Sequence, residues 1–253
     1  TVLLQILSNL ANDLGDGLKG TDNENRIGPA RAIQSGEISV KSMKFAVLSC
    51  SLLAFTSGLI LLINALDPGW EFYLLFSIGI AGIAASIKYT LGKNAYGYFG
   101  FGDLFVFVFF GLIGVLGTVY LQTKTIDWID AIPAVAVGML CVGVLNLNNM
   151  RDFKSDKSSN KRTLVVIMGP AAAKIYHSLL TLIPVTLLFG YLVNIQSGFD
   201  SLALIIPFIL LLSAVIRIHK TNKAADLDPE LRKLALTTFL AAMLFTASLV
   251  IPL

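Results

Sequence analysis

The chain has 253 residues, of which 55% are hydrophobic and only 14% charged, and its mean hydropathy is +0.77. Soluble domains usually contain about 25% charged residues, so this composition excludes a soluble globular enzyme. The net charge of +3 is too small to indicate a particular kind of partner. Because the chain is so hydrophobic, we expect it to lie in a lipid bilayer and not to bind a nucleic acid.

Eight apolar segments follow one another along the chain, and most approach or exceed the roughly 20 residues that cross a bilayer as a helix. They are 1–11, 43–66, 70–90, 103–122, 128–147, 169–194, 200–218 and 233–253. The pattern predicts an all-α, polytopic transmembrane bundle that forms a single domain over 1–253. The first segment is about half a span and begins at Thr1 without a Met, so we expect an upstream helix to be missing from the given sequence.

The connections between these segments alternate between long polar stretches and short, nearly uncharged ones. The long connections are 12–42, 88–102, 148–168 and 217–233, and the short ones are 67–70, 123–128 and 194–200. With the adjoining helix ends, the long connections hold 18 of the 19 Lys and Arg residues, and only Lys124 lies on the other side. Because basic residues concentrate in cytoplasmic loops, we expect the long connections to face the cytoplasm.

The first long connection opens with carboxamide and carboxylate side chains at helical spacing. Asn12 and Asp16 are four residues apart, and residues i and i+4 share one face of a helix. Asn9 and Asp13 have the same spacing on a neighbouring face of the helix. The sequence therefore does not decide which of the two pairs, Asn9 and Asp13 or Asn12 and Asp16, belongs to the site. Asp22 comes after a glycine at which we expect the helix to end.

The stretch NNMRDFKSDKSSNKRT repeats this pattern between two apolar segments. Asn148, Asp152 and Asp156 follow at intervals of four. Acidic clusters at membrane-helix ends are costly unless a cation neutralises them, and Mg²⁺ does so with one or two carboxylates, water and phosphate oxygens. Arg151 and Lys161 suit phosphate oxygens. Ordinary solvated charges would explain either cluster alone, but the matched spacing of both favours metal-bridged diphosphate binding.

The stretch KYTLGKNAYGYFGFGD combines a tyrosine–lysine pair with four glycines. Tyr89 and Lys93 are four residues apart, so a helix would direct a hydroxyl and an ammonium to the same phosphate. The other aromatic residues are more typical of anchors at the membrane interface than of ligand contacts: they are Tyr96, Tyr98, Phe99 and Phe101.

The stretches NDLGDGLKGTDNENRIGPARAIQSGEIS, YGYFGFGD and NNMRDFKSDKSSNKRTL resemble the UbiA superfamily of intramembrane prenyltransferases. Within it they are most similar to the 1,4-dihydroxy-2-naphthoate polyprenyltransferases of menaquinone biosynthesis. The resemblance covers essentially the whole chain. It implies nine transmembrane helices around a central cavity, with cytoplasmic Asp-rich loops, in a multi-pass protein of the bacterial inner (plasma) membrane. Eight segments fit this fold if the first helix is lacking.

The resemblance also implies roles for individual residues. The implied metal ligands are Asp13, Asp16, Asp22, Asp152 and Asp156. The implied substrate-binding residues are Asn12, Asn148, Asn149, Arg151, Lys161, Arg26 and Arg31. The implied catalytic residues are Asp16, Asp152, Asp156, Lys93 and Tyr89. Two positions depart from the family pattern: Gly20 replaces a frequent Asp, which puts the role of Asp22 in doubt, and Asn160 replaces a common Gly, although Asn tolerates a left-handed backbone.

The implied reaction is the Mg²⁺-dependent transfer of a polyprenyl group from polyprenyl diphosphate to 1,4-dihydroxy-2-naphthoate. CO₂ and diphosphate leave, and demethylmenaquinone results. Metal and basic side chains would stabilise the leaving diphosphate, and an apolar cavity would keep water from the allylic cation. The prenyl chain length cannot be deduced from any pattern in the sequence.

Three alternatives remain at this stage. A related enzyme would use another aromatic acceptor. The stretch DLGDGLKG partly resembles the signature of CDP-alcohol phosphotransferases, but that signature has Ala-Arg where this chain has Lys19-Gly20, and it does not require a second cluster. A cation transporter would place carboxylates near mid-membrane, whereas no Asp or Glu lies deep within a predicted span.

Overall fold

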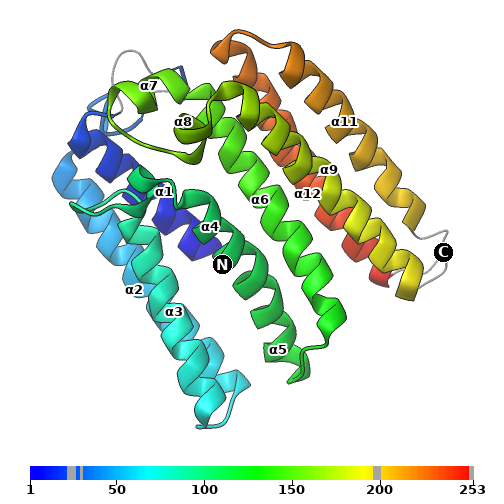
Figure 1. Ribbon diagram of the computed structural model, residues 1–253. Helices are drawn as coiled ribbons and strands as arrows, with labels where there is room; N and C mark the ends of the chain where they lie inside the picture. Colours follow the sequence, from blue (N-terminus) through cyan, green and yellow to red (C-terminus); the bar gives the residue numbers. More distant parts are fainter. Residues whose placement is uncertain (22–26, 29–30, 196–200, 251–253) are drawn as a thin grey trace.

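The computed structural model describes residues 1–21, 27–28, 31–195 and 201–250. Throughout this part of the chain every regular element is helical, and the helices pack side by side into one bundle (Figure 1). Among the described residues, seven helical segments are long and apolar enough to cross a membrane, and the N-terminal helix Val2–Lys19 is not one of them. The prediction of an all-α, polytopic membrane bundle is confirmed.

The helices have the following bounds in chain order. They are α1 (Val2–Lys19), α2 (Val40–Ala65), α3 (Trp70–Lys88), the 3₁₀ helix η1 (Tyr96–Phe99), α4 (Gly102–Val106), η2 (Phe107–Leu116), α5 (Gly117–Thr123), η3 (Trp128–Asp130), α6 (Ala131–Arg151), α7 (Phe153–Ser158), α8 (Leu164–Met168), α9 (Pro170–Ile195), η4 (Leu202–Leu204), α11 (Ile205–Lys220), η5 (Ala224–Asp226) and α12 (Leu227–Val250). The segment from α4 through the π-helical η2 to α5 forms one span, Gly102–Thr123.

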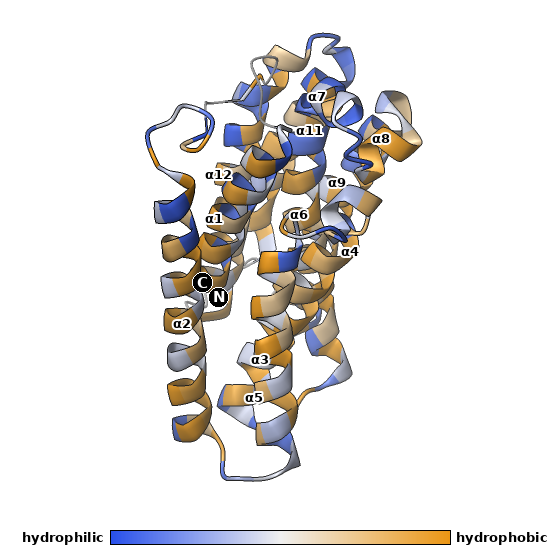
Figure 2. Ribbon diagram, turned by 90° about the vertical axis from the view of Figure 1, so that its left-hand side faces the viewer, coloured by the Kyte–Doolittle hydropathy of each residue, from blue (hydrophilic) through white to orange (hydrophobic). Residues whose placement is uncertain are grey.

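The two ends of the bundle differ in polarity. Hydrophilic residues gather at the end that carries α7 and α8, whereas the helices below are mainly hydrophobic (Figure 2). This polar end collects the connections that follow α1, α3, α6 and α11, and the connection between α2 and α3 lies at the opposite end (Figure 1). The described residues of the predicted long polar connections therefore lie together at one end.

Helix α1 is longer than the apolar segment 1–11 that predicted it, because it continues through polar residues to Lys19. It ends at Gly20, whose left-handed backbone (φ 69°) lets the amide N–H of that residue donate to the carbonyl of Asp16. The helix stop expected at this glycine is thus present. As a result, Asn12 and Asp16 lie on the last two turns of a helix and not in a loop.

Close packing fixes α1 against its neighbours α2 and α3. A Cβ atom on Gly15 would lie 2.5 Å from Oγ1 of Thr90, just beyond α3, so only glycine permits this approach. The Thr90 hydroxyl donates to the carbonyl of Ala11 at 2.8 Å. The buried side chains of this region form one hydrophobic cluster: Leu7, Leu14, Met43, Val47 and Cys50.

Helix α6 lies at the centre of the bundle and contacts η2, α9 and α12. A Cβ atom on Gly111 of η2 would lie 2.5 Å from Cα of Gly138. Small residues let membrane helices approach to this distance, so these two glycines fix η2 against the central helix. The opposite face of η2 is thereby presented to α1 and α3.

Candidate active site

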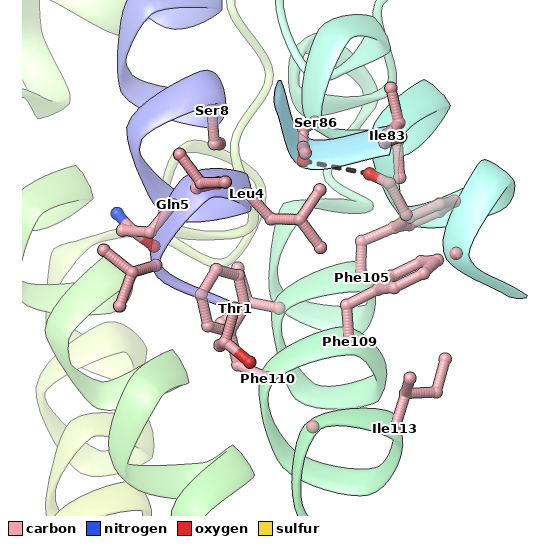
Figure 3. A pocket seen from close by; sticks show the side chains of 18 of the residues that line it. Thr1, Leu4, Gln5, Ser8, Ile83, Ser86, Phe105, Phe109, Phe110 and Ile113 are labelled. Carbon is pink, nitrogen blue, oxygen red and sulfur yellow. Dashed lines mark hydrogen bonds between the residues drawn. The ribbon is translucent and has the colours of Figure 1, made fainter. Parts of the chain in front are cut away.

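A cavity of about 940 Å³ lies between α1, α2, α3, the α4–η2–α5 span and α6. Polar side chains line it at the polar end of the bundle: Asn12, Arg31, Asn148, Asn149 and Lys161. Apolar side chains line most of the rest, among them Leu4, Phe105, Phe109 and Ile113. Figure 3 shows Leu4 of α1 extending toward the phenyl rings of the α4–η2 segment. The cavity thus joins a cationic, amide-bearing head to an apolar body.

Stacked aromatic rings form one wall of this cavity. The ring centroids of Tyr89 and Tyr96 are 5.4 Å apart, and those of Tyr96 and Phe105 are 3.9 Å apart and nearly parallel. Phe109 continues the series at 6.1 Å from Phe105. The wall leads from the polar end toward the middle of the bundle. Aromatic faces stabilise positive charge without offering a nucleophile.

One stripe of the cavity wall formed by α1 is polar, beside the apolar Leu4. Gln5, Ser8, Asn9 and Asn12 line it at helical spacing, and the Gln5 amide donates to Oδ1 of Asn9 at 3.2 Å. Polar side chains at membrane depth are costly and usually functional. This stripe therefore suits a ligand that carries hydroxyl or carboxylate groups.

The first ionic group of the site, which we call the lysine cluster, consists of Asp16, Asp156, Lys161 and Tyr98. The Lys161 ammonium donates to Oδ2 of Asp16 at 2.9 Å and lies 4.0 Å from Oδ1 of Asp156. The Tyr98 hydroxyl donates to the other oxygen of Asp16 at 2.7 Å. Burial lowers the pKa of Lys161, but the charges of Asp16 and Asp156 outweigh it, so its pKa is raised and the ammonium stays charged.

The backbone after α7 returns Lys161 to this cluster. Asn160 adopts a left-handed conformation (φ 56°), which asparagine tolerates better than most residues. The amide of Lys161 then donates to the carbonyl of Asp156 at 2.8 Å, and the amide of Arg162 donates to the carbonyl of Tyr98 at 3.2 Å. The segment that follows α7 thus packs against η1. Asn160 adopts the backbone conformation required at this position, although it stands where the family commonly has glycine.

The second ionic group, the arginine cluster, consists of Arg151, Asn148, Asp152 and Asp228. Arg151 is 3% exposed. Its Nε and Nη2 donate to Asp152 at 2.8 and 2.9 Å, its Nη2 also donates to Oδ1 of Asn148 at 2.8 Å, and its Nη1 donates to Oδ1 of Asp228 at 2.8 Å. The guanidinium therefore joins the end of α6 to the first turn of α12.

Asp152 and Asp156 are one helical turn apart, because the amide of Asp156 donates to the carbonyl of Asp152 at 2.9 Å, but their carboxylates pair with different cations. Helix α6 ends at Arg151, and Asp152 (φ −89°, ψ 6°) separates it from α7. Asp152 pairs with Arg151, whereas Asp156 lies beside Lys161. The two carboxylates, which the spacing alone would direct to one point, therefore belong to different clusters.

The register of the first motif is resolved by its contacts. With its amide oriented to satisfy both neighbours, Asn12 donates to Oδ2 of Asp16 at 3.1 Å and accepts from Arg31 at 3.0 Å. Asp13 instead accepts from the amide of Ala32 at 3.2 Å, which ties α1 to the following segment. In this register, Asp16 belongs to the lysine cluster and Asn12 is hydrogen-bonded to it.

Tyr89 and Lys93 are not brought together by the fold. Helix α3 ends at Lys88, and Gly92 has φ 91°. Tyr89 lines the cavity, whereas Lys93 is exposed in the turn. Burial is the main cause that raises the pKa of Tyr89, to about 12, so the phenol is a neutral hydrogen-bond donor at physiological pH. Asp22 and Arg26 lie outside the described residues.

Two contributors to the site were not among the predicted residues. Tyr98 was assigned to an interfacial anchor, yet it bonds to Asp16. Asp228 was not considered, yet it pairs with Arg151 from 77 positions away. The YGYFGFGD stretch could have indicated Tyr98, because its glycines allow a close approach to a neighbouring segment. No local pattern marks Asp228.

The lysine cluster has the composition of a site for a hard divalent cation. No three of the described His, Cys, Asp and Glu side chains surround one point, so a cage built from protein ligands alone is absent from this part of the chain. Asp16 and Asp156, which share one ammonium, provide the two carboxylates that Mg²⁺ takes when water and phosphate oxygens complete its shell. The buried pair thus fits a metal that arrives with a phosphorylated ligand.

The sequence profile described as the UbiA prenyltransferase family matches residues 1–241. The chain is 38% identical to a 1,4-dihydroxy-2-naphthoate octaprenyltransferase of Haemophilus influenzae, over 99% of this chain and 82% of that protein. It is 46% identical to the Escherichia coli protein of the same name over 70% of this chain. It is 41% identical to the Mycobacterium tuberculosis protein of that name over 71%.

The extent of these matches differs between the relatives. The match covers 58% of the length of the Escherichia coli protein and 59% of the length of the Mycobacterium tuberculosis protein. It covers 82% of the length of the Haemophilus influenzae protein. No solved structure matches this chain at a significant level.

Proposed function

We propose that this chain, which belongs to the UbiA prenyltransferase family, transfers a polyprenyl group from polyprenyl diphosphate to 1,4-dihydroxy-2-naphthoate. The observation that carries this proposal is the cavity of about 940 Å³, which has a cationic head and an apolar body. A polyprenyl diphosphate has the same division. Its diphosphate suits Lys161 and Arg31, and its tail suits the wall of Phe105 and Phe109.

Members of this family generally depend on a divalent metal, and we assign Mg²⁺ to this chain, held by Asp16 and Asp156. When bound, the metal neutralises the diphosphate and stabilises its departure. Lys161 and Arg31 add positive charge at the same head of the cavity. Arg151 fixes the ends of α6 and α12 and keeps Asp152 in place.

The chain then separates a reactive carbocation from water. The bond between the allylic carbon and the diphosphate oxygen breaks, and its electron pair leaves with diphosphate. The rings of Tyr89, Tyr96 and Phe105 line the cavity, so they place aromatic π-electrons beside the cation and exclude water. The carboxylate-bearing carbon of the acceptor forms the new bond, and CO₂ leaves as its electrons return to the ring.

We assign the acceptor to the α1 side of the cavity. Its hydroxyl and carboxylate groups match the amides of Gln5, Asn9 and Asn12, and Arg31 lines the same region. The reacting carbons must approach to about 3–3.5 Å. We therefore assign the acceptor to the space between the amide stripe and the aromatic wall, next to the diphosphate.

Membranes that contain the protein should be incubated with a radiolabelled polyprenyl diphosphate and Mg²⁺, and offered 1,4-dihydroxy-2-naphthoate, 1-hydroxy-2-naphthoate or 4-hydroxybenzoate. We expect a labelled product and CO₂ with the first acid, and no product after EDTA until Mg²⁺ is restored. Preferred transfer to the benzoate would assign the chain another acceptor, and undiminished transfer in excess EDTA would remove the metal from the proposal.

We also propose that the polar end faces the cytoplasm of a bacterial plasma membrane, because 18 of the 19 Lys and Arg residues belong to that side. Cysteines introduced at the exposed positions Ser158 and Thr125 lie at the polar end and at the opposite end of the bundle. An impermeant thiol reagent should label Thr125→Cys in intact cells and not Ser158→Cys. The reverse pattern would invert the orientation.

A transporter is disfavoured by the positions of the acidic side chains. In the described ranges each Asp and Glu lies at or near a helix end or in a connection, and the buried Asp16 and Asp156 lie at the polar end. Ion paths across a membrane require ionisable groups near its middle. A vesicle flux assay should therefore show no Mg²⁺ transport.

A further inference from the structure

The carboxylate oxygens of Asp16 are satisfied without a metal. Oδ1 accepts from the Tyr98 hydroxyl at 2.7 Å, and Oδ2 accepts from Lys161 at 2.9 Å and from Asn12 at 3.1 Å. Asp16 is 3% exposed and Lys161 is 7% exposed. A buried carboxylate is stable only when paired and hydrogen-bonded, and here a lysine ammonium provides the pairing that a metal would otherwise provide.

Lys161 also stands between the acidic pair and the cavity. It lines the cavity, together with Asn12, whereas neither Asp16 nor Asp156 is among the described residues that line it. The ammonium lies 2.9 and 4.0 Å from the nearest oxygens of these two carboxylates. A cation that approaches from the cavity therefore meets a like charge before it reaches its ligands.

The geometry points to Lys161 as an exchangeable placeholder: its ammonium occupies the metal position of the donor-free protein and moves to the diphosphate when metal and donor bind together. This inference rests on the proposed function for the identity of the donor. Lys161 reaches both the acidic pair and the cavity head from one backbone position. A lysine stem is flexible and carries a compact charge, so exchange requires a change of side-chain rotamer and no movement of a helix.

Such an exchange couples the two ligands. Without a diphosphate, the metal must displace the ammonium from Asp16 and Asp156, which are its only carboxylate partners among the described residues. With a diphosphate in the cavity, the ammonium gains a new partner as it leaves the carboxylates. The diphosphate therefore raises the affinity for the metal, and the metal raises the affinity for the diphosphate by the same factor.

The test measures metal binding without any transfer reaction. Binding of Mn²⁺ to the purified protein in detergent is followed by electron paramagnetic resonance at buffered free Mn²⁺, with and without inorganic pyrophosphate. We expect pyrophosphate to tighten Mn²⁺ binding to the wild type by about tenfold or more, and Lys161→Met to bind Mn²⁺ about tenfold more tightly than the wild type without pyrophosphate, because a nearby like charge is removed.

Lys157→Met is the matched control. It removes the same charge from an exposed position on α7, and it should leave Mn²⁺ affinity within about twofold of the wild type at ordinary salt. Equal or weaker Mn²⁺ binding by Lys161→Met would overturn the inference. So would wild-type binding that pyrophosphate does not change.

Thermal unfolding, measured with and without Mg²⁺, shows whether Lys161→Met is destabilised and whether the metal restores its stability. Loss of the ammonium removes the cation that lies 2.9 and 4.0 Å from Asp16 and Asp156, so the unfolding midpoint should fall and Mg²⁺ should restore it, since a ligand that binds only the folded state stabilises it. A midpoint that falls and does not respond to Mg²⁺ would make Lys161 a structural residue only. None of these measurements uses prenyl donor or acceptor, so the proposed function stands or falls separately in the transfer assay.

Discussion

The lysine cluster and the arginine cluster lie at the same end of the bundle, and each neutralises carboxylates with one buried cation. They differ in how firmly the cation is held. The Arg151 guanidinium donates to Asn148, Asp152 and Asp228 from fixed directions. The Lys161 ammonium has one close carboxylate at 2.9 Å and a second at 4.0 Å.

This difference separates two tasks within one site. A planar fork with several simultaneous partners is difficult to displace and holds backbone segments in place. A single ammonium on a flexible stem exchanges partners easily. The arginine cluster therefore suits a structural clamp on α6 and α12, and the lysine cluster suits the part of the site in which charge changes during turnover.

The largest effect is expected from Asp16→Asn, which removes the charge at the centre of the lysine cluster. The loss of preorganised charge stabilisation should lower kcat by roughly 10³-fold, measured as prenyl transfer at saturating donor and acceptor. Asp13→Asn is the control, because Asp13 accepts from the backbone amide of Ala32, whereas Asp16 accepts from Lys161 and Tyr98; it should lower kcat less than tenfold. If the two variants lose equal activity, Asp13 contributes to transfer as much as Asp16 does.

Arg151→Lys tests the clamp. Lysine cannot satisfy Asn148, Asp152 and Asp228 together, so the free energy of unfolding should fall by about 2 kcal/mol, measured by thermal or denaturant unfolding in detergent. Arg232→Lys, an exposed partner of Asp228 at 3.8 Å, should change it by less than about 0.5 kcal/mol. If Arg151→Lys is as stable as the wild type, the arginine cluster is not a structural clamp, and its cation is held no more firmly than Lys161.

Tyr98→Phe removes one hydrogen bond to Asp16 and leaves the lysine pair intact. A hydrogen bond to a charged group contributes about 1.5 kcal/mol, so kcat should fall by roughly tenfold. Tyr73→Phe, exposed at the far end of the bundle, should have no effect on transfer. A loss as large as that of Asp16→Asn would give Tyr98 a direct part in the chemistry.

The smallest effect is expected from Tyr89→Phe, about threefold in transfer, because one neutral donor at the cavity wall is lost. Burial raises the pKa of Tyr89 from its ordinary 10.0 to about 12. Since the folded protein retains this proton longer than the unfolded chain, stability should decline only as pH rises from 10 toward 12. The ratio of wild-type to Tyr89→Phe activity should therefore stay constant between pH 6 and 9, and a ratio that changes in that range would indicate an ionised phenol.

The sequence predicts most of the bundle because hydropathy alone decides which segments enter a bilayer. The i, i+4 spacing also identifies Asn12 and Asp16, since both lie on one uninterrupted helix. The same rule fails where a helix stops. Asp152 interrupts the second motif, and the end of α3 leaves Lys93 in an exposed turn.

The contacts between distant segments were beyond any local pattern. Tyr98 reaches Asp16 across 82 positions, and Arg151 reaches Asp228 across 77. Both depend on how η1 and α12 pack against the ends of α1 and α6. Packing of this kind follows from the shape of the whole bundle, so a sequence spacing cannot encode it.

The contact between Arg151 and Asp228 has a consequence for the order in which the site is built during synthesis. Arg151 follows the central helix, but Asp228 lies on the last described helix, α12. In a nascent chain that has inserted only through α11, Arg151 already pairs with the adjacent Asp152 but lacks its second carboxylate partner, Asp228. The contact that fixes the end of α6 against α12 is therefore completed only after α12 has entered the bilayer.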